Sequence, residues 1–488
     1  MNFKNVPSNT KIPLFHAEIS NRAANIFSNS GRALIIGLAT TDNETPFFAT
    51  DEATVIANCG RGSMCHRDYL KFRANNTSTE LWILPVKENS AGVAATGKLT
   101  LAGTATADGI LQLYINATRV QVPVASGDTA SSIATAAAAL INANTMLPCT
   151  ASASGGEITL TATAKGAWGN GIMIEINMNG ADAGEETPAG ITPTITAFAS
   201  GAGDPDLTEK IAILGDREYD FIINPFCDTT NLNVIRDFMN DTVGRWSDDQ
   251  QIYGHAWSIL AGTASACQTF GNARNDQHNT IFGIQGARQL TDEILAAAVG
   301  RIALAYINDP ARPVTFAELS GVYMPTESNR WDKATRNTLL GNGISTFRFT
   351  ESAFQIERVV TTYQRNSAGE ADVSYRETNT MYTLQYIVRK LRSAITSKYP
   401  DYKLADDGYA GTDNAVVTPG ILKAEILAQY HDMCVNSPVV CENEELFAAA
   451  LVVERDSTDV NRVNAYIAPD LVNQLLIFAA LVEFRLNF

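Results

Sequence analysis

Hydrophobic residues follow two patterns along the chain, and the two patterns alternate. A continuous apolar run from Ala33 to Leu38 is typical of a strand buried on both faces of a parallel sheet. Helix-like segments follow at 51–58 and 63–73, and a second strand-like run occupies 80–86. The same alternation resumes after residue 204, with strands expected at 219–225, 256–260 and 280–284 and helices at 231–242 and 291–307. This order predicts an α/β core with right-handed crossovers.

A segment of different composition separates the two halves of this core. Ala, Thr, Gly and Ser dominate residues 91–203. Short strand patterns recur there at 98–101, 111–115, 120–124, 157–161 and 172–176. Asp128 is a good N-cap for an alanine-rich helix that follows it. Because these local signals agree with one another, we expect an inserted β-rich domain at 89–203 that divides the core into 31–88 and 204–325.

The stretch from 339 to 395 combines both patterns. β-branched and aromatic runs at 344–350 and 354–363 predict a hairpin. Apolar residues then recur at steps of three and four up to Ile395, which marks one face of a helix. The other face carries basic side chains, namely Arg376, Arg389, Lys390, Arg392 and Lys398. Two interpretations stay open: a solvated helix face, or a contact of Arg389 and Arg392 with an acidic partner subunit.

Both ends of the chain have extended patterns. Prolines at positions 7 and 13 favour extended backbone in the segment 1–30, and Leu14, Phe15 and Ile19 follow in a loose alternation. The C-terminal end alternates strictly, with Phe478, Ala480, Val482, Phe484 and Leu486 on one face. Neither end has an evident hairpin partner nearby. The N-terminal segment is either a frayed terminus or an arm that adds a strand to another subunit.

Composition and charge narrow the function classes. The 488 residues are enough for two to four domains. A formal net charge of −16 argues against direct binding of a nucleic-acid backbone. The seven cysteines form no CxxC pair, which favours free thiols in a reducing compartment. Since the longest apolar run, 475–482, is far shorter than the roughly 20 residues of a membrane helix, we expect no membrane insertion.

Motifs for catalysis or cofactor binding are absent from the sequence. It contains no GxxxxGK[ST], HExxH or GxSxG pattern. The glycines at 166–171 lie among strand patterns, where a turn is expected. Cys59, Cys65 and His66 are close together, but three soft ligands alone are weak evidence for a metal. We therefore expect no catalytic residue, no metal and no cofactor.

Two segments resemble a known family. The run from Ile356 to Tyr363, a polar loop, and the run from Tyr375 to Arg389 are similar to the C-terminal domain of contractile phage tail sheath proteins. The alanine- and threonine-rich insertion is similar to that of Mu-like sheath proteins. The resemblance implies a subtilisin-like core without its catalytic residues, a C-terminal sheath domain at 326–476, and an exchange strand at 477–488.

The resemblance also implies a function. Such proteins form stacked six-subunit rings around a tail tube protein, bind baseplate and tail terminator proteins, and contract to drive the tube through the host envelope. This chain would then be a virion protein that is assembled in the host cytoplasm, and its terminal arms and basic helix would contact other subunits. The alternatives are an α/β hydrolase-like enzyme with an accessory β module, and a surface adhesin, which the missing signal peptide disfavours.

Overall fold

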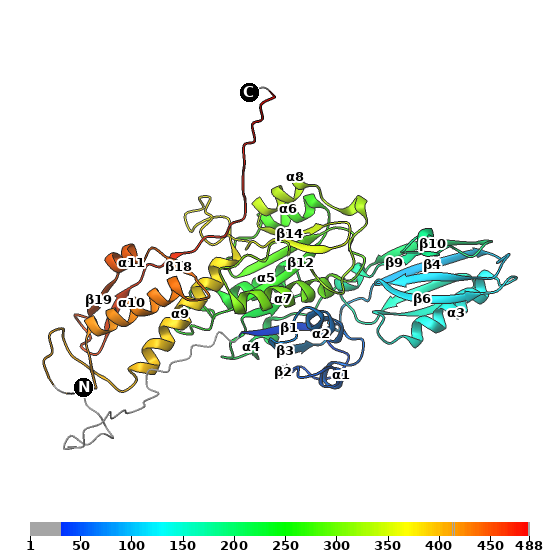
Figure 1. The fold of residues 1–488 in the computed structure, drawn as a ribbon. Helices are drawn as coiled ribbons and strands as arrows, with labels where there is room; N and C mark the ends of the chain where they lie inside the picture. The colour runs from blue at the N-terminus through cyan, green and yellow to red at the C-terminus, as the bar shows by residue number, and fades with distance from the viewer. Residues whose placement is uncertain (1–30, 412, 414, 487–488) are drawn as a thin grey trace, which may run out of the picture. The chain divides into compact units, whose positions relative to one another are not determined.

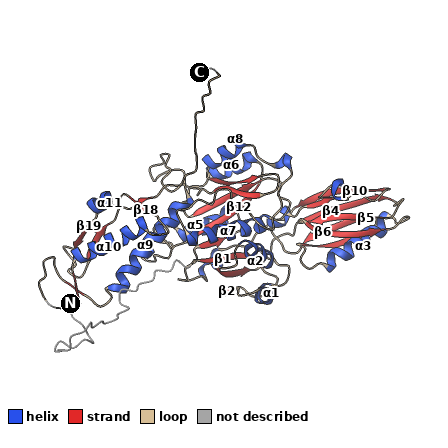
Figure 2. Ribbon diagram, in the orientation of Figure 1, coloured by secondary structure: helices blue, strands red, loops and turns tan. Residues whose placement is uncertain are grey.

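The structure is a computed structural model that describes residues 31–411, 413 and 415–486 (Figure 1). The chain divides into two compact units, which are described separately. The larger contains Ser30–Asn308, Arg312–Tyr382 and Gln474–Phe488, and the smaller contains Asp309–Ala311 and Thr383–Asn473. Helices and sheets are mixed throughout (Figure 2), which confirms the expected multidomain α/β class.

An eight-stranded sheet forms the centre of the larger unit, in the order β15-β14-β13-β12-β11-β1-β3-β2. Its strands are β1 (Arg32–Leu38), β2 (Phe47–Phe48), β3 (Glu80–Val86), β11 (Phe221–Ile223), β12 (His255–Ala261), β13 (Asn279–Ile284), β14 (Ile344–Phe349) and β15 (Phe354–Arg358). The strands from β14 to β3 are parallel, and the two outermost strands pair antiparallel. The predicted α/β core is therefore present.

Helices cover both faces of this sheet. They are α1 (Glu52–Cys59), α2 (Met64–Asn75), α4 (Thr208–Ala212), α5 (Thr229–Met239), α6 (Ala264–Asn272), α7 (Thr291–Asn308) and α8 (Lys333–Gly341). Ala33 and Ile35 of β1 lie in one hydrophobic cluster with side chains of α2 and α7. Leu34 and Ile36 lie in another cluster, with side chains of α4 and α5. Since successive strand residues point to opposite faces, coverage of both faces explains why β1 has no polar alternation.

The insertion contains two small sheets and one helix. Its elements are β4 (Thr96–Gly103), β5 (Gly109–Ile115), β6 (Thr118–Val124), α3 (Ala130–Ala143), β7 (Cys149–Ser154), β8 (Glu157–Ala162), β9 (Ile174–Ile176) and β10 (Ile191–Ala199). The sheet orders are β10-β4-β8-β7 and β6-β5-β9. Where the insertion joins the core, the N–H of Val93 donates to the carbonyl of Ala202 over 2.8 Å. The two connections of the insertion therefore lie side by side.

One cap within the insertion differs from the prediction. Thr129, not Asp128, is the N-cap of α3, and its hydroxyl oxygen accepts from the N–H of Ser132 over 3.2 Å. The carboxylate of Asp128 accepts instead from the N–H of Ala125 over 2.8 Å. The prediction was wrong by one residue because either side chain can cap a helix.

The hairpin of β14 and β15 belongs to the core sheet. Ile281 and Phe282 of β13 pair in parallel with Ile344 and Ser345 of β14. The segment 312–382 accordingly lies in the larger unit, whereas the sequence pattern places the start of the C-terminal domain at 326. The hairpin pattern alone does not indicate which sheet a hairpin joins.

The smaller unit is built around two helices. Its elements are α9 (Thr378–Lys398, which enters the unit at Thr383), α10 (Pro419–Val435), α11 (Glu444–Ala450), β16 (Lys403–Leu404), β17 (Val416–Val417), β18 (Cys441–Glu442), β19 (Val452–Arg455), β20 (Val463–Tyr466) and β21 (Asp470–Leu471). The rings of Tyr430 and Phe447 stack with centroids 3.6 Å apart, and Tyr386, Ile387 and Met433 share their cluster. Among the described helices, none combines the length and apolar character that a membrane crossing needs.

Candidate assembly surfaces

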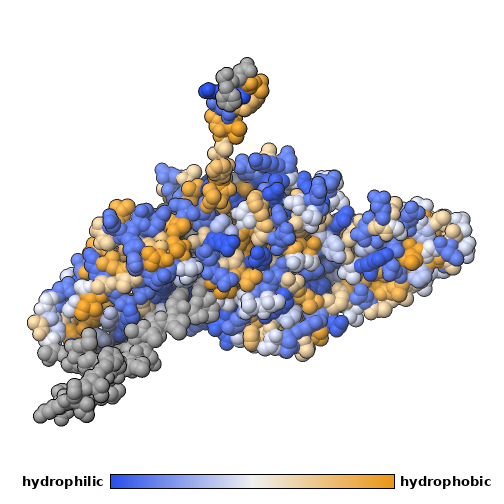
Figure 3. Space-filling model, in the orientation of Figure 1, coloured by the Kyte–Doolittle hydropathy of each residue, from blue (hydrophilic) through white to orange (hydrophobic). Residues whose placement is uncertain are grey.

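The C-terminal segment presents a long apolar surface that the described part of its own chain leaves open. From Asn473 to Leu486 the backbone forms no helix or strand. Seven of its large apolar side chains are between 77% and 87% exposed: Leu475, Ile477, Phe478, Leu481, Val482, Phe484 and Leu486. Ala480 is exposed as well. Figure 3 shows the segment in orange at the C-terminal end of the chain. Burying such a run is favourable, by roughly 25 cal/mol of free energy per Å² of apolar surface removed from water.

The other terminal prediction cannot be compared with the structure. Leu14, Phe15 and Ile19 lie outside the described residues.

The basic residues of α9 do not form one solvated face. The ammonium of Lys390 is bonded to the carboxylate of Asp432 on α10, and Lys390 is only 8% exposed. This bond lowers the pKa of Asp432. The ammonium of Lys398 lies 2.7 Å from the carboxylate of Glu425, also on α10. Two of the predicted surface cations therefore join helices within one chain.

Arg389 and Arg392, the two residues proposed for subunit contact, lie on the same helix and are half-buried. Arg376 lies before α9, and its side chain lies 3.0 Å from the carboxylate of Glu377.

The position where α/β enzymes bind substrates is filled by apolar side chains. In a parallel sheet this position lies beyond the carboxyl ends of the strands where the strand order reverses, here between β1 and β11. Leu38 at the end of β1 and Phe226 after β11 are buried in one hydrophobic cluster. Trp168, from the insertion, packs against the same cluster. The insertion thus contributes to closing this crevice.

The residues considered as metal ligands serve other purposes. Cys59 and Cys65 are fully buried, and burial raises the pKa of the Cys65 thiol well above its ordinary value. His66 Nε2 lies 3.1 Å from a carboxylate oxygen of Glu52. No cluster of three or more His, Cys, Asp or Glu side chains suited to a metal occurs in the described part of the chain. The glycine-rich segment forms a short 3₁₀ turn, Ala167–Gly171, as expected.

A buried charge cluster where the insertion meets the core was missed at the sequence level. Arg67, Asp68, Asp292 and Glu293 are each less than 5% exposed. Arg67 Nε donates to Glu293 Oε1 over 3.1 Å, and the ammonium of Lys71 lies 3.6 Å from Glu293 Oε2. The spacing of Arg67 and Lys71 along a helix was the available signal, but their acidic partner comes from the other half of the divided core.

Two carboxyl groups of this cluster have raised pKa values. Burial, followed by the charge of Asp292, raises the pKa of Asp68 well above its ordinary value. Burial raises the pKa of Asp292 to about 6, against the attraction of Arg67. Burial and like charge thus both oppose ionisation of these two carboxyl groups.

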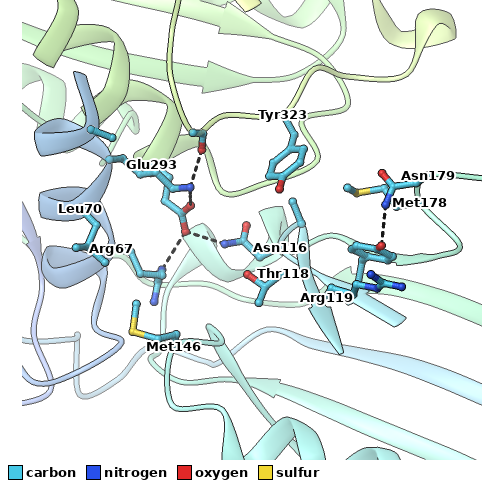
Figure 4. A pocket seen from close by; sticks show the side chains of 15 residues that line it. Arg67, Leu70, Asn116, Thr118, Arg119, Met146, Met178, Asn179, Glu293 and Tyr323 are labelled. Carbon is cyan, nitrogen blue, oxygen red and sulfur yellow. Dashed lines mark hydrogen bonds and ion pairs between the residues drawn. The ribbon is translucent and has the colours of Figure 1, made fainter. Parts of the chain in front are cut away.

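A cavity of about 600 Å³ opens beside the cluster (Figure 4). Its wall combines core residues with residues of the insertion. The core contributes Arg67, Leu70, Lys71, Glu293 and Tyr323, and the insertion contributes Tyr114, Asn116, Thr118, Arg119, Met146, Met178 and Asn179.

These features describe a multidomain α/β chain with buried apolar side chains where the strand order reverses and an exposed apolar C-terminal segment. Two known domains match parts of the chain. Residues 200–362 match the phage tail sheath protein central domain, and residues 370–485 match the phage tail sheath C-terminal domain. The Mu-like prophage FluMu tail sheath protein of Haemophilus influenzae is 36% identical over 496 residues, covering all of both chains.

Two solved sheath structures are similar to the chain over most of its length. The sheath tail protein of Listeria innocua is 13% identical with a TM-score of 0.48, and the comparison covers 92% of this chain and 94% of the other. That of Desulfitobacterium hafniense is 12% identical with a TM-score of 0.46, covering 94% and 99%.

The chain belongs to the phage tail sheath family. It is a structural protein of a contractile tail sheath, and hence a component of the virion. The alternative of an α/β hydrolase-like enzyme receives no support.

Proposed function

We propose that copies of this chain assemble as six-subunit rings stacked around a tail tube protein, and that the stack contracts to drive the tube through the host envelope. Assembly takes place in the host cytoplasm, between a baseplate and a tail terminator protein. The core has a subtilisin-like topology and acts as a scaffold without catalysis. The apolar filling of the crevice between β1 and β11 supports this role, because function depends on a site and not on the fold that carries it.

The exposed apolar segment at the C-terminus carries the proposal. Exposure of its apolar side chains to water is unfavourable. An unpaired apolar strand that stays exposed in solution is an aggregation hazard. The segment becomes harmless when a neighbouring subunit supplies a sheet edge that pairs with it. Each backbone hydrogen bond contributes about 0.5–1.5 kcal/mol net. One exchanged strand is thus a modest link, and many links around a ring hold the sheath together while subunits move.

Two further contacts and the placement of the insertion belong to the same proposal. Leu14, Phe15 and Ile19 provide the corresponding arm at the N-terminus. Arg389 and Arg392 contact an acidic neighbour, which suits a chain of net charge −16. The insertion at 89–203 folds independently and projects outward from the sheath, because its composition changes abruptly and its pattern of strands and helix is complete in itself.

Deleting Ala479–Phe488 tests the proposed strand exchange. We expect a soluble, folded subunit that no longer forms tubes under negative-stain electron microscopy, because residues 479–486 are exposed in their own chain. Two point variants refine the test. Phe484→Ser changes the face predicted to bind, whereas Arg485→Ser, next to it, changes the opposite face and is the matched control. Tubes of normal length from the deletion would overturn strand exchange at this end.

A further inference from the structure

The turn between β5 and β6 approaches the core at one point. Asn116 and Ala117 form this turn with φ values of 51° and 57°, the left-handed conformation of a tight hairpin. Asparagine tolerates this conformation better than most residues. Asn116 is nevertheless only 6% exposed, although hairpin turns usually face solvent. Something other than turn geometry therefore accounts for its burial.

The side chain of Asn116 bonds to the core with both of its polar atoms. Asn116 Oδ1 accepts from the backbone N–H of Leu290, directly before α7, over 2.5 Å. Asn116 Nδ2 donates to Glu293 Oε1 over 2.7 Å (Figure 4). The first N–H groups of a helix lack partners within the helix. One amide from the insertion thus partners the chain at the start of a core helix and also a carboxylate in its first turn.

The Glu293 carboxylate depends on this bond. The same oxygen accepts from Arg67 Nε of α2, and the other oxygen accepts from Gln289 Nε2 over 3.3 Å. Glu293 is 3% exposed, and a buried carboxylate is stable only when its oxygens are bonded. Asn116 therefore joins an ion pair that already links two core helices.

Apolar contacts beside this turn support the same placement. The side chain of Leu290, a core residue, is buried within the hydrophobic cluster of the insertion. Arg288, two residues earlier, lies 3.4 Å from the carboxylate of Glu175 on β9. These contacts are independent of Asn116, and they place the same stretch of the core against the insertion.

We infer that Asn116 is a positioning residue that fixes the inserted domain on the core, by binding the start of α7 and the buried carboxylate of Glu293 with one side chain. The insertion consequently moves with the core instead of swinging on its two connections.

Asn116→Gly in the full-length chain is the direct test. Glycine adopts a φ of 51° without strain, so the variant removes the side chain and leaves the turn intact. We expect hydrogen exchange of the Leu290 amide to accelerate at least tenfold, while the amide of Ile35, which is buried in the centre of the core sheet, stays within twofold of the parent chain.

Asn177→Gly is the matched control. Asn177 also has a left-handed φ, of 53°, but its Nδ2 donates to Thr187 Oγ1 inside the insertion. This variant should leave the Leu290 amide unchanged. An unchanged Leu290 amide in a folded Asn116→Gly variant would overturn the inference.

Asn116→Asp decides the case if the glycine variant fails to fold. It keeps an acceptor for Leu290 but places a second carboxyl group against Glu293. The Leu290 amide should then exchange faster at pH 8 than in the parent chain, and the difference should shrink as pH falls and one carboxyl group takes up a proton. A purely structural loss would not depend on pH in this way, and a rate equal to that of the parent at pH 8 would contradict the inference.

Discussion

β1 and residues 475–482 of the C-terminal segment are both continuous apolar runs, yet one is buried and the other is largely exposed. Leu34, Ile35 and Ile36 of β1 have no exposed surface, because strands flank them and helices cover both faces of the sheet. Phe478 and Leu481 in the C-terminal segment are more than 80% exposed. Hydropathy therefore indicates that a segment will be covered, but not whether its own chain or another chain covers it.

Pairing within the chain accounts for the difference. β1 is followed by segments that return to pair with it: β3, which precedes the insertion, and β11, which comes after it. The described part of the sheets offers the C-terminal segment no pairing. A terminal apolar strand with no partner of its own is suited to exchange between subunits.

The largest expected effect comes from placing the same charge in each run. Ile35→Asp should prevent folding, because a buried carboxylate without a partner costs at least about 4 kcal/mol against total stabilities of about 5–15 kcal/mol. Phe484→Asp should leave the melting temperature of the isolated subunit within about 1 °C of the parent, because Phe484 is 80% exposed. Circular dichroism of both variants provides the measurement.

Tube formation should distinguish the two faces of the C-terminal segment. Phe484→Asp should reduce tube formation strongly, whereas Glu483→Gln, its neighbour on the opposite face, should not. A Phe484→Asp subunit that melts many degrees lower than the parent would contradict the comparison, because it would mean that the segment is covered by its own chain.

The same distinction explains how much of the fold could be predicted from the sequence. β1, α7 and the hairpin of β14 and β15 have strong local periods, and they were predicted. β7 and β10 were missed, since Ala, Ser and Thr dominate them and leave little apolar alternation. Local patterns also did not assign the hairpin to the core sheet, because that pairing depends on β13, which α7 and α8 separate from the hairpin in the chain.

The sites were less predictable than the fold. Asparagine is an ordinary residue in a turn, so Asn116 does not stand out in the sequence. The core residue that it contacts, Leu290, lies 174 positions later in the chain. Asp292 and Glu293 are at a helix N-terminus, where solvent would satisfy them, but Arg67 and Asn116 surround Glu293 instead. Contacts of this range are invisible to a single sequence without structural information.

A smaller effect tests the titration of Asp292 in the buried charge cluster. The pKa of Asp292 is about 6 in the folded chain, against about 3.9 for an unperturbed aspartate. The folded state thus binds this proton more tightly than the unfolded state. Its contribution favours folding below about pH 4 and is lost as pH rises to about 6. The loss amounts to about 3 kcal/mol at most, at 1.36 kcal/mol for each pKa unit.

Asp292→Asn isolates this contribution. Relative to the variant, the parent chain should lose free energy of unfolding between pH 4 and pH 7, measured by urea denaturation. Asp332→Asn is the control of opposite sign, because its bond to the N–H of Thr335 lowers the pKa of Asp332. A parent-to-variant difference that is flat across this range would show that Asp292 titrates normally.

The smallest expected effect on subunit stability separates two kinds of partner on α9. Lys390→Glu should destabilise the subunit by about 2 kcal/mol, less than a fully buried pair would lose, because the Asp432 side chain is 42% exposed. Tubes should still form wherever the subunit folds.

Arg389→Glu combined with Arg392→Glu should mainly reduce tube formation. Added salt should weaken assembly of the parent chain, because exposed charges are screened beyond about 8 Å at physiological ionic strength. Denaturant unfolding and tube yield, measured on the same samples, distinguish the two outcomes. If the double arginine variant unfolds as readily as Lys390→Glu and its folded fraction builds normal tubes, the basic residues of α9 hold only their own chain together, and the neighbouring subunit must bind elsewhere.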